Sequence, residues 1–391
     1  MIFSVFSFIP TYDLTTPIYT ARGGEFDWQL GQKLTTSTLE WLAMGGCWSG
    51  ELSIPVRPTE ILSWINNGLG LHIEVWNRVG QIVWDGYVDT MTFSLGNIDI
   101  QFGPLSDVGN QVGVTYAPLL DATLSPPLYG VETETILATN DLSQSRYGVW
   151  ERWFQAEPGE CSKDHAEANR DRYLKEIAFP KPSHAIDLLT SNNTVLKLGL
   201  LGYCHRLKSY VYESAVTATT TASVKLAAVL DADPNGIFSS SNASIETNAF
   251  LVTAEENKNR IAEAIVNEIV SIGADATDDR FTFGVYPGRY VKYAQIPDRN
   301  APIYQRAIYA LSVSAERYGL GYEIDPWDIQ PAQWLYQPDV ELGKMPTNGG
   351  ENDIRYMFIE SVKFSDPYGV SVNGEPQSTL AQMQAKAQME L

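Results

Sequence analysis

Apolar and polar residues alternate most clearly between residues 71 and 116. The first run has the period-two pattern of a half-buried strand, carried by Leu71, Ile73 and Val75. Residues 81–95 continue it and are long enough for one bent strand or two. Gly96-Asn97 is a two-residue hairpin signal, and strict alternation resumes at Ile98. The stretch therefore predicts an antiparallel β-meander, and no catalytic motif lies within it.

Residues 1–120 are predicted to form an N-terminal β-barrel domain around this meander. The apolar run MIFSVFSFIP indicates a first strand, because it is too short for a signal peptide and lacks the basic residues of one. One short helix is expected after Pro58, with Thr59 as its N-cap and Gly68 at its end.

Residues 121–220 are predicted to form a β-rich or α+β middle domain. A charged helix is expected over residues 162–177, with Ser162 as its N-cap and two prolines beyond its end. The apolar run at residues 195–213 then predicts a return to strands. Cys204 and His205 would lie within that strand.

Residues 221–280 are predicted to form a helical or α+β insert. A first helix is expected over residues 222–230, closed by the turn sequence DADPNG. A second helix is expected behind the capping-box pattern of Thr253 and Glu256, with Gly273 as its C-cap. Its buried face is predicted from four isoleucines at helical spacing, which are Ile261, Ile265, Ile269 and Ile272.

Alternating aromatic strands return after this insert. Residues 281–375 are predicted to form a second β-barrel region, starting with a hairpin around Pro287-Gly288. Residues 376–391 are predicted to form an amphipathic C-terminal helix. The expected fold class is mainly β with an α+β insert, built as two β-barrel-type domains plus smaller peripheral domains.

The charge balance excludes one class of function. The 391 residues include 47 acidic and 27 basic side chains, for a net charge of −20. Such a surface repels phosphates, so nucleic-acid binding through basic patches is not expected. An acidic wall would still suit a channel through which DNA slides without sticking.

Cysteine usage and hydropathy bear on the compartment. Three cysteines are an odd number and too few for a disulfide framework, so we expect reduced thiols at Cys47, Cys161 and Cys204. No window approaches the roughly 18 apolar residues of a membrane-spanning helix. A soluble protein made in a cytoplasm is the expectation.

Asp231, Asp233 and Asn235 match the first oxygen ligands of a calcium loop, followed by Gly236. The last ligand position is Asn242, where the loop requires a bidentate Glu. The same residue types are common in a turn after a helix, so we interpret DADPNG as a turn. A weak calcium site at Asp231 and Asp233 stays open as the alternative.

Cysteine and histidine lie close in sequence at two places, which raises the question of a zinc site because thiolate and imidazole are the preferred ligands of zinc. The candidates are Cys161 with His165 and Cys204 with His205. Adjacent residues of a strand point to opposite faces, and no C-x-x-C pair occurs, so the spacing disfavours a zinc site.

Hydrolase motifs are missing: the sequence contains no G-x-S-x-G, no H-E-x-x-H and no P-loop. Carboxylates are so abundant that a glycosidase pair stays open. Five tryptophans fit either a sugar-binding groove or the interior of barrels and interfaces, namely Trp41, Trp48, Trp64, Trp76 and Trp84. We expect no catalytic, cofactor-binding or metal-binding residues, and no cofactor.

Several motifs together resemble one protein family, and the likeness spans most of the chain. WDGYVDTM and FGPLSDVGNQVGVTY resemble the N-terminal barrel of the tail hub, or baseplate hub, proteins of long-tailed bacteriophages. SQSRYGVWE is similar to the S-x-x-x-YG-x-x-E turn that this family carries between its first barrel and the next domain. FTFGVYPGRYVKY, DPWDIQPAQW and FIESVKFSDP are similar to later strands of the family. The chain departs from the pattern at Gln333, where Gly or a charged residue would fit the turn.

The resemblance implies a structural protein without enzymatic activity, similar to the T4-type baseplate hub. In that family, paired β-barrels from three subunits form a pseudo-hexameric ring at the tail tip. The implied homotrimer joins the distal tail or tail tube protein to a three-fold tail-tip or central fibre protein. The tape measure protein is a further implied partner, and DNA passes through the lumen without specific binding.

The implied location is the virion, at the phage tail tip, after assembly in the cytoplasm of the host bacterium. If the chain is a hub, we expect acidic side chains on the lumen, because basic ones would slow the passing duplex. Two alternatives stay open: a distal tail ring component with a carbohydrate-binding role, and a glycoside hydrolase.

Overall fold

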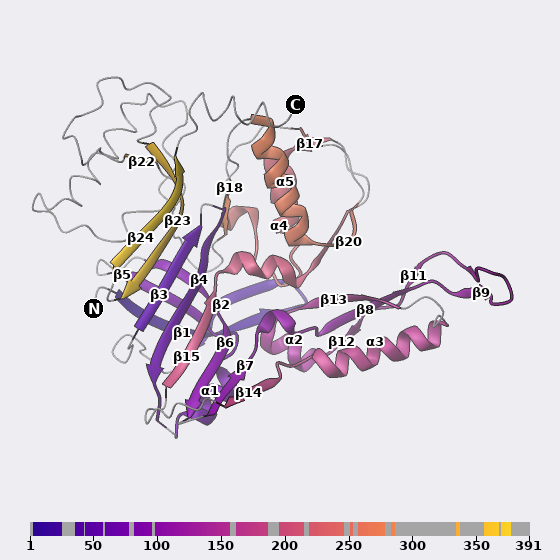
Figure 1. The fold of residues 1–391 in the computed structure, drawn as a ribbon, viewed down its shortest axis with the longest axis horizontal. Coiled ribbons are helices and arrows are strands. Elements are labelled where there is room, and N and C mark those ends of the chain that lie inside the picture. The colour runs from indigo at the N-terminus through magenta and orange to yellow at the C-terminus, as the bar shows by residue number, and fades with distance from the viewer. Residues whose placement is uncertain are drawn as a thin grey trace, which may run out of the picture.

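The computed structural model describes fifteen segments of the chain. They are residues 3–25, 36–42, 44–57, 59–77, 82–95, 98–156, 162–186, 195–214, 219–245, 251–252, 257–277, 283–285, 334–336, 356–366 and 369–376. Strands dominate these segments, and a few helices pack beside them (Figure 1). The prediction of a mainly β protein is therefore confirmed.

One sheet of 14 strands organises the described residues. Its main path runs β2 (Ile18–Glu25), β1 (Phe3–Asp13), β5 (His72–Asn77), β6 (Ile82–Leu95), β15 (Val195–Leu201), β4 (Met44–Pro55), β3 (Thr36–Leu42), β23 (Tyr356–Asp366) and β22 (Trp334–Tyr336). Branching from this path are β7 (Ile98–Phe102), β14 (Pro182–Ile186), β18 (Ala243–Ile245), β21 (Phe283–Val285) and β24 (Gly369–Pro376). In the described part of the chain the sheets are not closed into barrels.

The predicted meander is present as β5, β6 and β7. Strand β6 is a single long strand that pairs with β5 along its first half and with β7 along its second. Leu95 lies opposite Ile98, which confirms the two-residue hairpin between them. On its other side, β6 pairs with β15, which lies between β6 and β4. Strands from four of the predicted domains thus share one sheet, since β23 pairs with β3 and β18 joins the sheet through β21.

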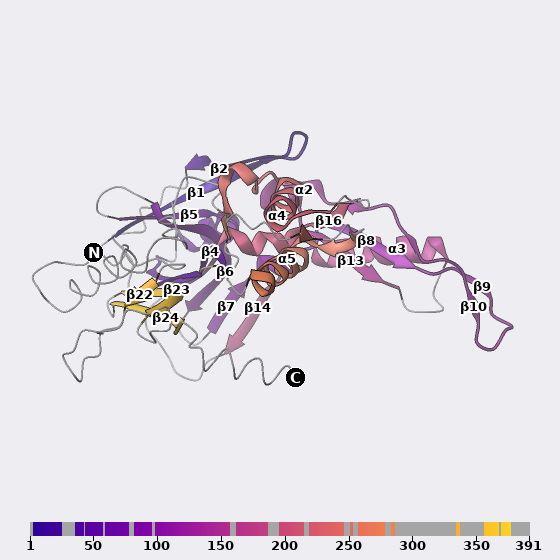
Figure 2. The ribbon, with the colours of Figure 1, turned by 90° about the horizontal axis from the view of Figure 1, so that it is seen from above.

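A helical layer packs beside this sheet (Figure 2). It contains the 3₁₀ helix η3 (Tyr203–Ser209), α4 (Ala222–Asp231) and α5 (Ala262–Thr277). The hydroxyl of Thr221 caps α4 by accepting a hydrogen bond from the backbone N–H of Val224. Apolar residues of α4 and α5 belong to the same buried core as the central strands. Two short ladders border this layer, β16 (Val211–Ser214) with β20 (Asn257–Ile261) and β17 (Thr220–Thr221) with β19 (Leu251–Val252).

Helix α5 corrects the prediction of its boundaries. Thr253 and Glu256 lie outside the described residues, but the helix does not start directly behind them, because residues 257–261 form β20 and the helix begins at Ala262. Ile261 pairs with Val211 as a strand residue, so β-pairing outweighs its helical spacing there. Ile265 and Ile269 are buried as the periodicity predicted. The helix continues beyond Gly273 to Thr277.

A peripheral unit projects from the sheet, as Figures 1 and 2 show. It holds β8 (Gln111–Tyr116), β11 (Thr133–Glu134), β12 (Ala138–Thr139), β13 (Glu151–Gln155), α2 (Asp141–Tyr147) and α3 (Lys163–Ile177). Ser162 caps α3 as predicted, accepting a hydrogen bond from the backbone N–H of His165. The hairpin of β9 (Leu119–Asp121) and β10 (Leu128–Tyr129) extends farthest from the sheet.

Two further predictions are corrected, and two others fall on residues that the structure does not describe. Helix α1 (Ile61–Asn67) ends at Gly68 as predicted, but its N-cap is Glu60 and not Thr59. The strands expected over 195–213 are present as β15, which stops at Leu201, and β16, which starts at Val211, but η3 lies between them. The hairpin expected around Pro287-Gly288 and the C-terminal helix lie outside the described residues. Among the residues that are described, no helix is both long enough and apolar enough to cross a membrane.

Candidate functional site

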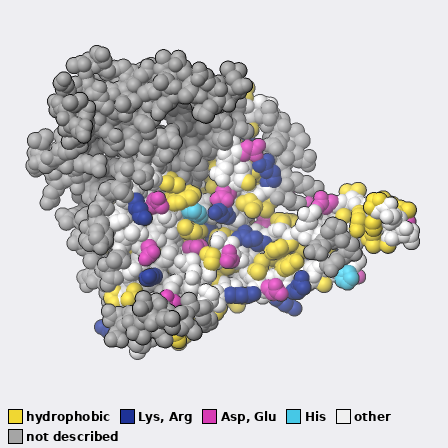
Figure 3. All heavy atoms as spheres, in the orientation of Figure 1, with side chains coloured by type: hydrophobic (Ala, Val, Ile, Leu, Met, Phe, Trp, Pro, Cys, Tyr) yellow, Lys and Arg dark blue, Asp and Glu magenta, His cyan; other side chains and the backbone are white. Residues whose placement is uncertain are grey.

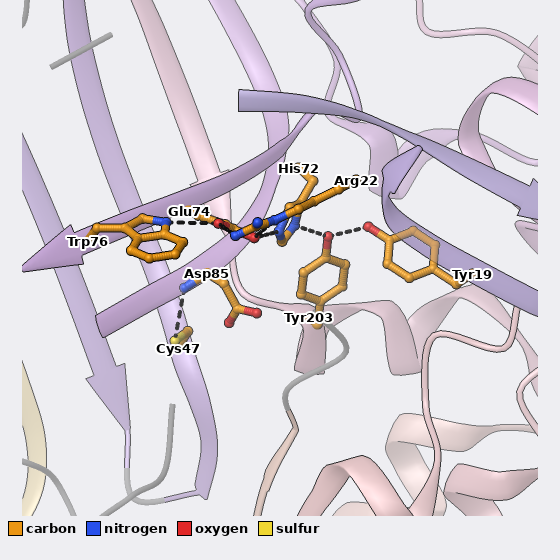
Figure 4. A network of polar contacts seen from close by, with 8 residues as sticks. All are labelled: Tyr19, Arg22, Cys47, His72, Glu74, Trp76, Asp85 and Tyr203. Atoms are coloured by element: carbon orange, nitrogen blue, oxygen red, sulfur yellow. Dashed lines mark hydrogen bonds and ion pairs between the residues drawn. The ribbon is translucent and has the colours of Figure 1, made fainter. Parts of the chain in front are cut away.

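A buried polar network lies where β2, β5, β6 and η3 meet (Figure 4). Alternation in β5 places His72, Glu74 and Trp76 on one face of the strand and its aliphatic residues on the other. His72 and Glu74 are fully buried, because side chains of β2 and η3 cover the face that a simple alternation pattern would assign to solvent. The central strand is therefore buried on both faces.

Glu74 is the centre of this network. Its carboxylate accepts hydrogen bonds from Nε of Arg22 (2.7 Å), from Nε2 of His72 (3.1 Å) and from Nε1 of Trp76 (2.8 Å). A second guanidinium nitrogen of Arg22 contacts the other carboxylate oxygen. Burial by itself raises the pKa of Glu74, but the hydrogen bonds from His72 and Arg22 outweigh it and lower that pKa to about 2. Glu74 is thus a buried carboxylate that stays ionised.

A chain of hydrogen bonds continues from Glu74 through His72 to two tyrosines. His72 Nδ1 and the Tyr203 hydroxyl are 2.6 Å apart, and that hydroxyl also contacts the hydroxyl of Tyr19. Burial raises the pKa of both Tyr203 and Tyr19 well above the usual value, so both phenols are neutral. The chain joins β5, η3 and β2, segments that are far apart in sequence.

Asp85 lies directly opposite Glu74 in the antiparallel register of β5 and β6. Its side chain is buried, and neither carboxylate oxygen has a hydrogen-bond partner among the described residues. Its backbone N–H donates to Sγ of Cys47 at 3.4 Å. Burial raises the pKa of Asp85 to about 7, with the charge of Glu74 adding to the rise and the Cys47 thiol opposing it. The two facing carboxyl groups therefore differ in protonation over most of the acidic range.

A second buried cluster surrounds Arg206 of η3. Its guanidinium lies 4.3 Å from the ring centre of Trp150, a cation–π distance, and donates to the carbonyl of Tyr147 at 2.8 Å. Tyr147 and Trp150 both belong to SQSRYGVWE, which turns at Gly148 with φ of 72°. The side-chain amide of Asn110 clamps this turn by donating to the Gly148 carbonyl and accepting from the Trp150 N–H.

DADPNG joins the same cluster as a turn. The carboxylate of Asp233 accepts hydrogen bonds from the backbone N–H groups of Asn235, Ile237 and Phe238. Asp231 accepts from the N–H and hydroxyl of Ser240. Both carboxylates are therefore used within their own loop. No group of three or more His, Cys, Asp or Glu side chains in the described segments is arranged to hold a metal ion.

Of the two candidate zinc pairs, Cys204 with His205 lies wholly within the described residues. Cys204 and His205 lie on η3 and not on a strand, so the expectation that they point to opposite faces of a strand was wrong. Burial raises the pKa of Cys204 to about 12 and lowers that of His205 to about 4. The ring of His205 packs on Trp48, with ring centres 4.1 Å apart. Cys161 lies outside the described residues.

The five tryptophans of the sequence pattern do not share one surface. Trp41, Trp64 and Trp84 are buried in the main core, Trp76 donates to Glu74, and Trp48 packs on His205. Trp41, Trp64 and Trp84 therefore fill the interior, which is one of the two roles expected from the sequence. Because they are buried, these three cannot line a sugar-binding groove.

The sequence did not single out the Glu74–Asp85 pair. Two facing carboxyl groups with pKa values pushed apart are the arrangement that glycosidases use for acid and nucleophile. Here both are buried, and the oxygens of Glu74 already accept hydrogen bonds from three side chains. The arrangement is suited to holding strands together. Comparison of the chain with protein-family models, curated proteins and solved structures gives no match.

Proposed function

We propose that this chain is a structural phage tail hub protein that acts without catalysis. In this proposal it forms a homotrimeric ring at the tail tip, joins the tail tube to three-fold tip proteins and surrounds the channel for DNA. The observation that carries the proposal is the role of SQSRYGVWE, the motif that resembles the inter-domain turn of hub proteins. Its polar groups are used to join structural units.

The contacts of this motif support a structural role step by step. The hydroxyl of Ser143 contacts the carbonyl of Ala178 at the end of α3. The N–H of Val149 donates to the side chain of Asn235 in the DADPNG turn at 2.5 Å. Arg206 fixes the carbonyl of Tyr147 from η3. One turn thus connects the peripheral unit with the helical layer through satisfied hydrogen bonds, which supports a junction that holds structural units together.

The two-barrel arrangement belongs to the proposal. β2 pairs only with β1 among the described strands, which leaves an edge that invites pairing with another chain. Ring formation by identical subunits covers such edges. The implied neighbours are the distal tail or tail tube protein, the tip or central fibre protein and the tape measure protein, and acidic side chains face the lumen.

Labelling of virions tests this function. Phage particles that carry an epitope-tagged copy are expected to bind antibody at the tail tip, and purified protein is expected to have about three times the 43.4 kDa mass of one chain. A distal tail ring component would instead assemble as six copies. Labelling elsewhere on the particle, or absence from it, would contradict the proposal.

A glycoside hydrolase is the second candidate, and the Glu74–Asp85 pair is the observation in its favour. Release of reducing sugars from bacterial polysaccharides, abolished in both Glu74→Gln and Asp85→Asn, would support this alternative over the structural role. We expect no turnover with the unaltered protein.

A further inference from the structure

The β9–β10 hairpin forms an arm, defined here as residues 117–132, that extends from the peripheral unit into solvent (Figure 1). Its neck is closed by a hydrogen bond from the Gly130 N–H to the Pro118 carbonyl, of 2.7 Å. Asp121 orders the turn by accepting from the N–H and hydroxyl of Thr123. The strands β9 and β10 pair only with each other among the described strands, so the arm is a separate appendage.

The arm exposes apolar side chains that nothing in the described structure covers. Leu120 is 63% exposed, Leu124 49% and Leu128 48%, and Figure 3 shows hydrophobic side chains gathered at its tip. A contiguous group of exposed apolar side chains often marks an interaction site, whereas single exposed apolar residues are common on any protein surface. The arm also carries two acidic residues, Asp121 and Glu132, and no basic one.

A surface of the same chain has complementary properties. The end of α3 and the residues after it carry Arg172, Lys175 and Lys181 against a single acid, Glu176. Within this basic segment Phe179 is 39% exposed. We call Lys175, Phe179 and Lys181 the Phe179 patch. In sequence this patch sets an exposed aromatic residue between two exposed lysines, while the chain as a whole has a net charge of −20.

The arm cannot reach this patch within one subunit. The carbonyl of Ile177, next to the patch, accepts a hydrogen bond from the N–H of Gly109, just before β8. The arm begins after the other end of β8, so about 20 Å of strand separates the two. The arm also points away from the α3 C-terminus (Figure 1). The arm and the Phe179 patch thus lie at opposite ends of the peripheral unit. This arrangement suits a head-to-tail contact, in which the arm of one copy meets the patch of the next.

We propose that the arm of one subunit packs on the Phe179 patch of a second copy of this chain. The inference rests on the proposed homotrimer and adds the surface through which neighbours hold each other. Such a contact is heterologous, and it closes into a ring when the rotation between copies is 120°. Apolar contact supplies affinity, and the opposite charges of the two surfaces select this pairing over others.

An armless variant of the full chain tests this contact. Residues 119–129 are replaced by a short Gly-Ser loop, which keeps Pro118 and Gly130 at the closed neck. Sedimentation velocity over a concentration series is expected to show at least a tenfold weaker self-association than for the unaltered protein. Trimers of unchanged affinity would overturn the inference and leave the hub proposal standing. Monomers of both proteins at every concentration would contradict both.

Single substitutions locate the contact. Leu124→Asp and Phe179→Asp are each expected to weaken self-association about tenfold, and their combination by less than the product, since they break one interface. Val224→Asp is the matched control, because Val224 is also exposed, at 57%, but lies on α4 away from both surfaces. Additive effects of the pair, or an equal effect of the control, would overturn the proposal.

Vesicle flotation tests whether the arm binds a membrane surface and not a second copy of the chain. With vesicles of phosphatidylcholine and phosphatidylglycerol, neither the unaltered nor the armless protein is expected to float, because anionic headgroups repel a chain with a net charge of −20. Flotation of the unaltered protein that is lost in the armless variant would make a membrane the occupant and overturn the inference.

Discussion

Glu74 on β5 and Asp85 on β6 face each other as a cross-strand pair of buried carboxyl groups. Glu74 accepts hydrogen bonds from three side chains, whereas the oxygens of Asp85 have no hydrogen-bond partner in the described structure. The negative charge of Glu74 is therefore stabilised by hydrogen bonds, whereas a negative charge on Asp85 would not be. Its cost to stability depends on pH.

The first prediction concerns Asp85→Asn. The pKa of Asp85 is raised to about 7, so between about pH 4 and pH 7 the folded protein holds a proton that the unfolded chain has lost. The free energy of unfolding therefore falls as pH rises through this range. Asparagine carries no such charge, and the variant is expected to be more stable by about 2–4 kcal/mol above pH 7. Urea unfolding at several pH values measures this.

The comparison must be a difference between variant and unaltered protein. His205, whose pKa is lowered to about 4, makes stability rise with pH over the same acidic range and partly masks Asp85. This contribution is common to both proteins and cancels in the difference. A stability difference that does not change between pH 4 and pH 8 would contradict the assignment.

The second prediction concerns Glu74→Leu. Removal of this carboxylate leaves Arg22, His72 and Trp76 without their shared acceptor, and we expect a loss of about 3–5 kcal/mol at pH 7. The pKa of Glu74 is lowered to about 2, so its contribution is present above about pH 4.5 and is lost as pH falls toward 2. The penalty should shrink in acid, as thermal unfolding at pH 7 and pH 2.5 can show.

Arg22→Met provides the matched partner for a double-mutant cycle. If the ion pair is the main interaction, the double variant should be less destabilised than the sum of the two single variants. Strict additivity would show that Arg22 and Glu74 do not interact, in disagreement with the structure.

The third prediction concerns the DADPNG turn. Both carboxylates of this turn already accept hydrogen bonds within their own loop, so we expect no bound ion. A bound ion would stabilise the fold by mass action, so calcium or a chelator is expected to leave the melting temperature unchanged. Asp233→Asn should cost about 1–2 kcal/mol, since it weakens the charge-assisted bonds to the N–H groups of Ile237 and Phe238. Asp231→Asn is the exposed control and should cost less. A chelator-induced fall of several degrees would support the calcium alternative.

Local patterns predicted those parts of the fold whose contacts are local. The alternation from Leu71, the hairpin between Leu95 and Ile98 and the cap at Ser162 depend on neighbouring residues and are all confirmed. Ile261 fits both a helix face and a strand, and its pairing with Val211, far away in sequence, decided the outcome. The insertion of β15 between β6 and β4 is non-local in the same way.

The buried network was missed for a related physical reason. His72 and Glu74 occupy the polar face of an alternating strand, which sequence reasoning assigns to solvent. Tyr203 of η3 covers that face and supplies a hydrogen-bond partner, but it comes 131 residues after His72. The available signal was a second acid, Asp85, in the neighbouring strand β6, opposite Glu74 in the register.

The central claim is that three copies of this chain form a ring at the tip of a phage tail. A cryo-EM map of intact virions is the most direct measurement. We predict three copies around the DNA channel, between the tail tube and the tip proteins, with acidic side chains toward the lumen. A sixfold ring of this chain, or a position of the chain away from the channel, would contradict the account.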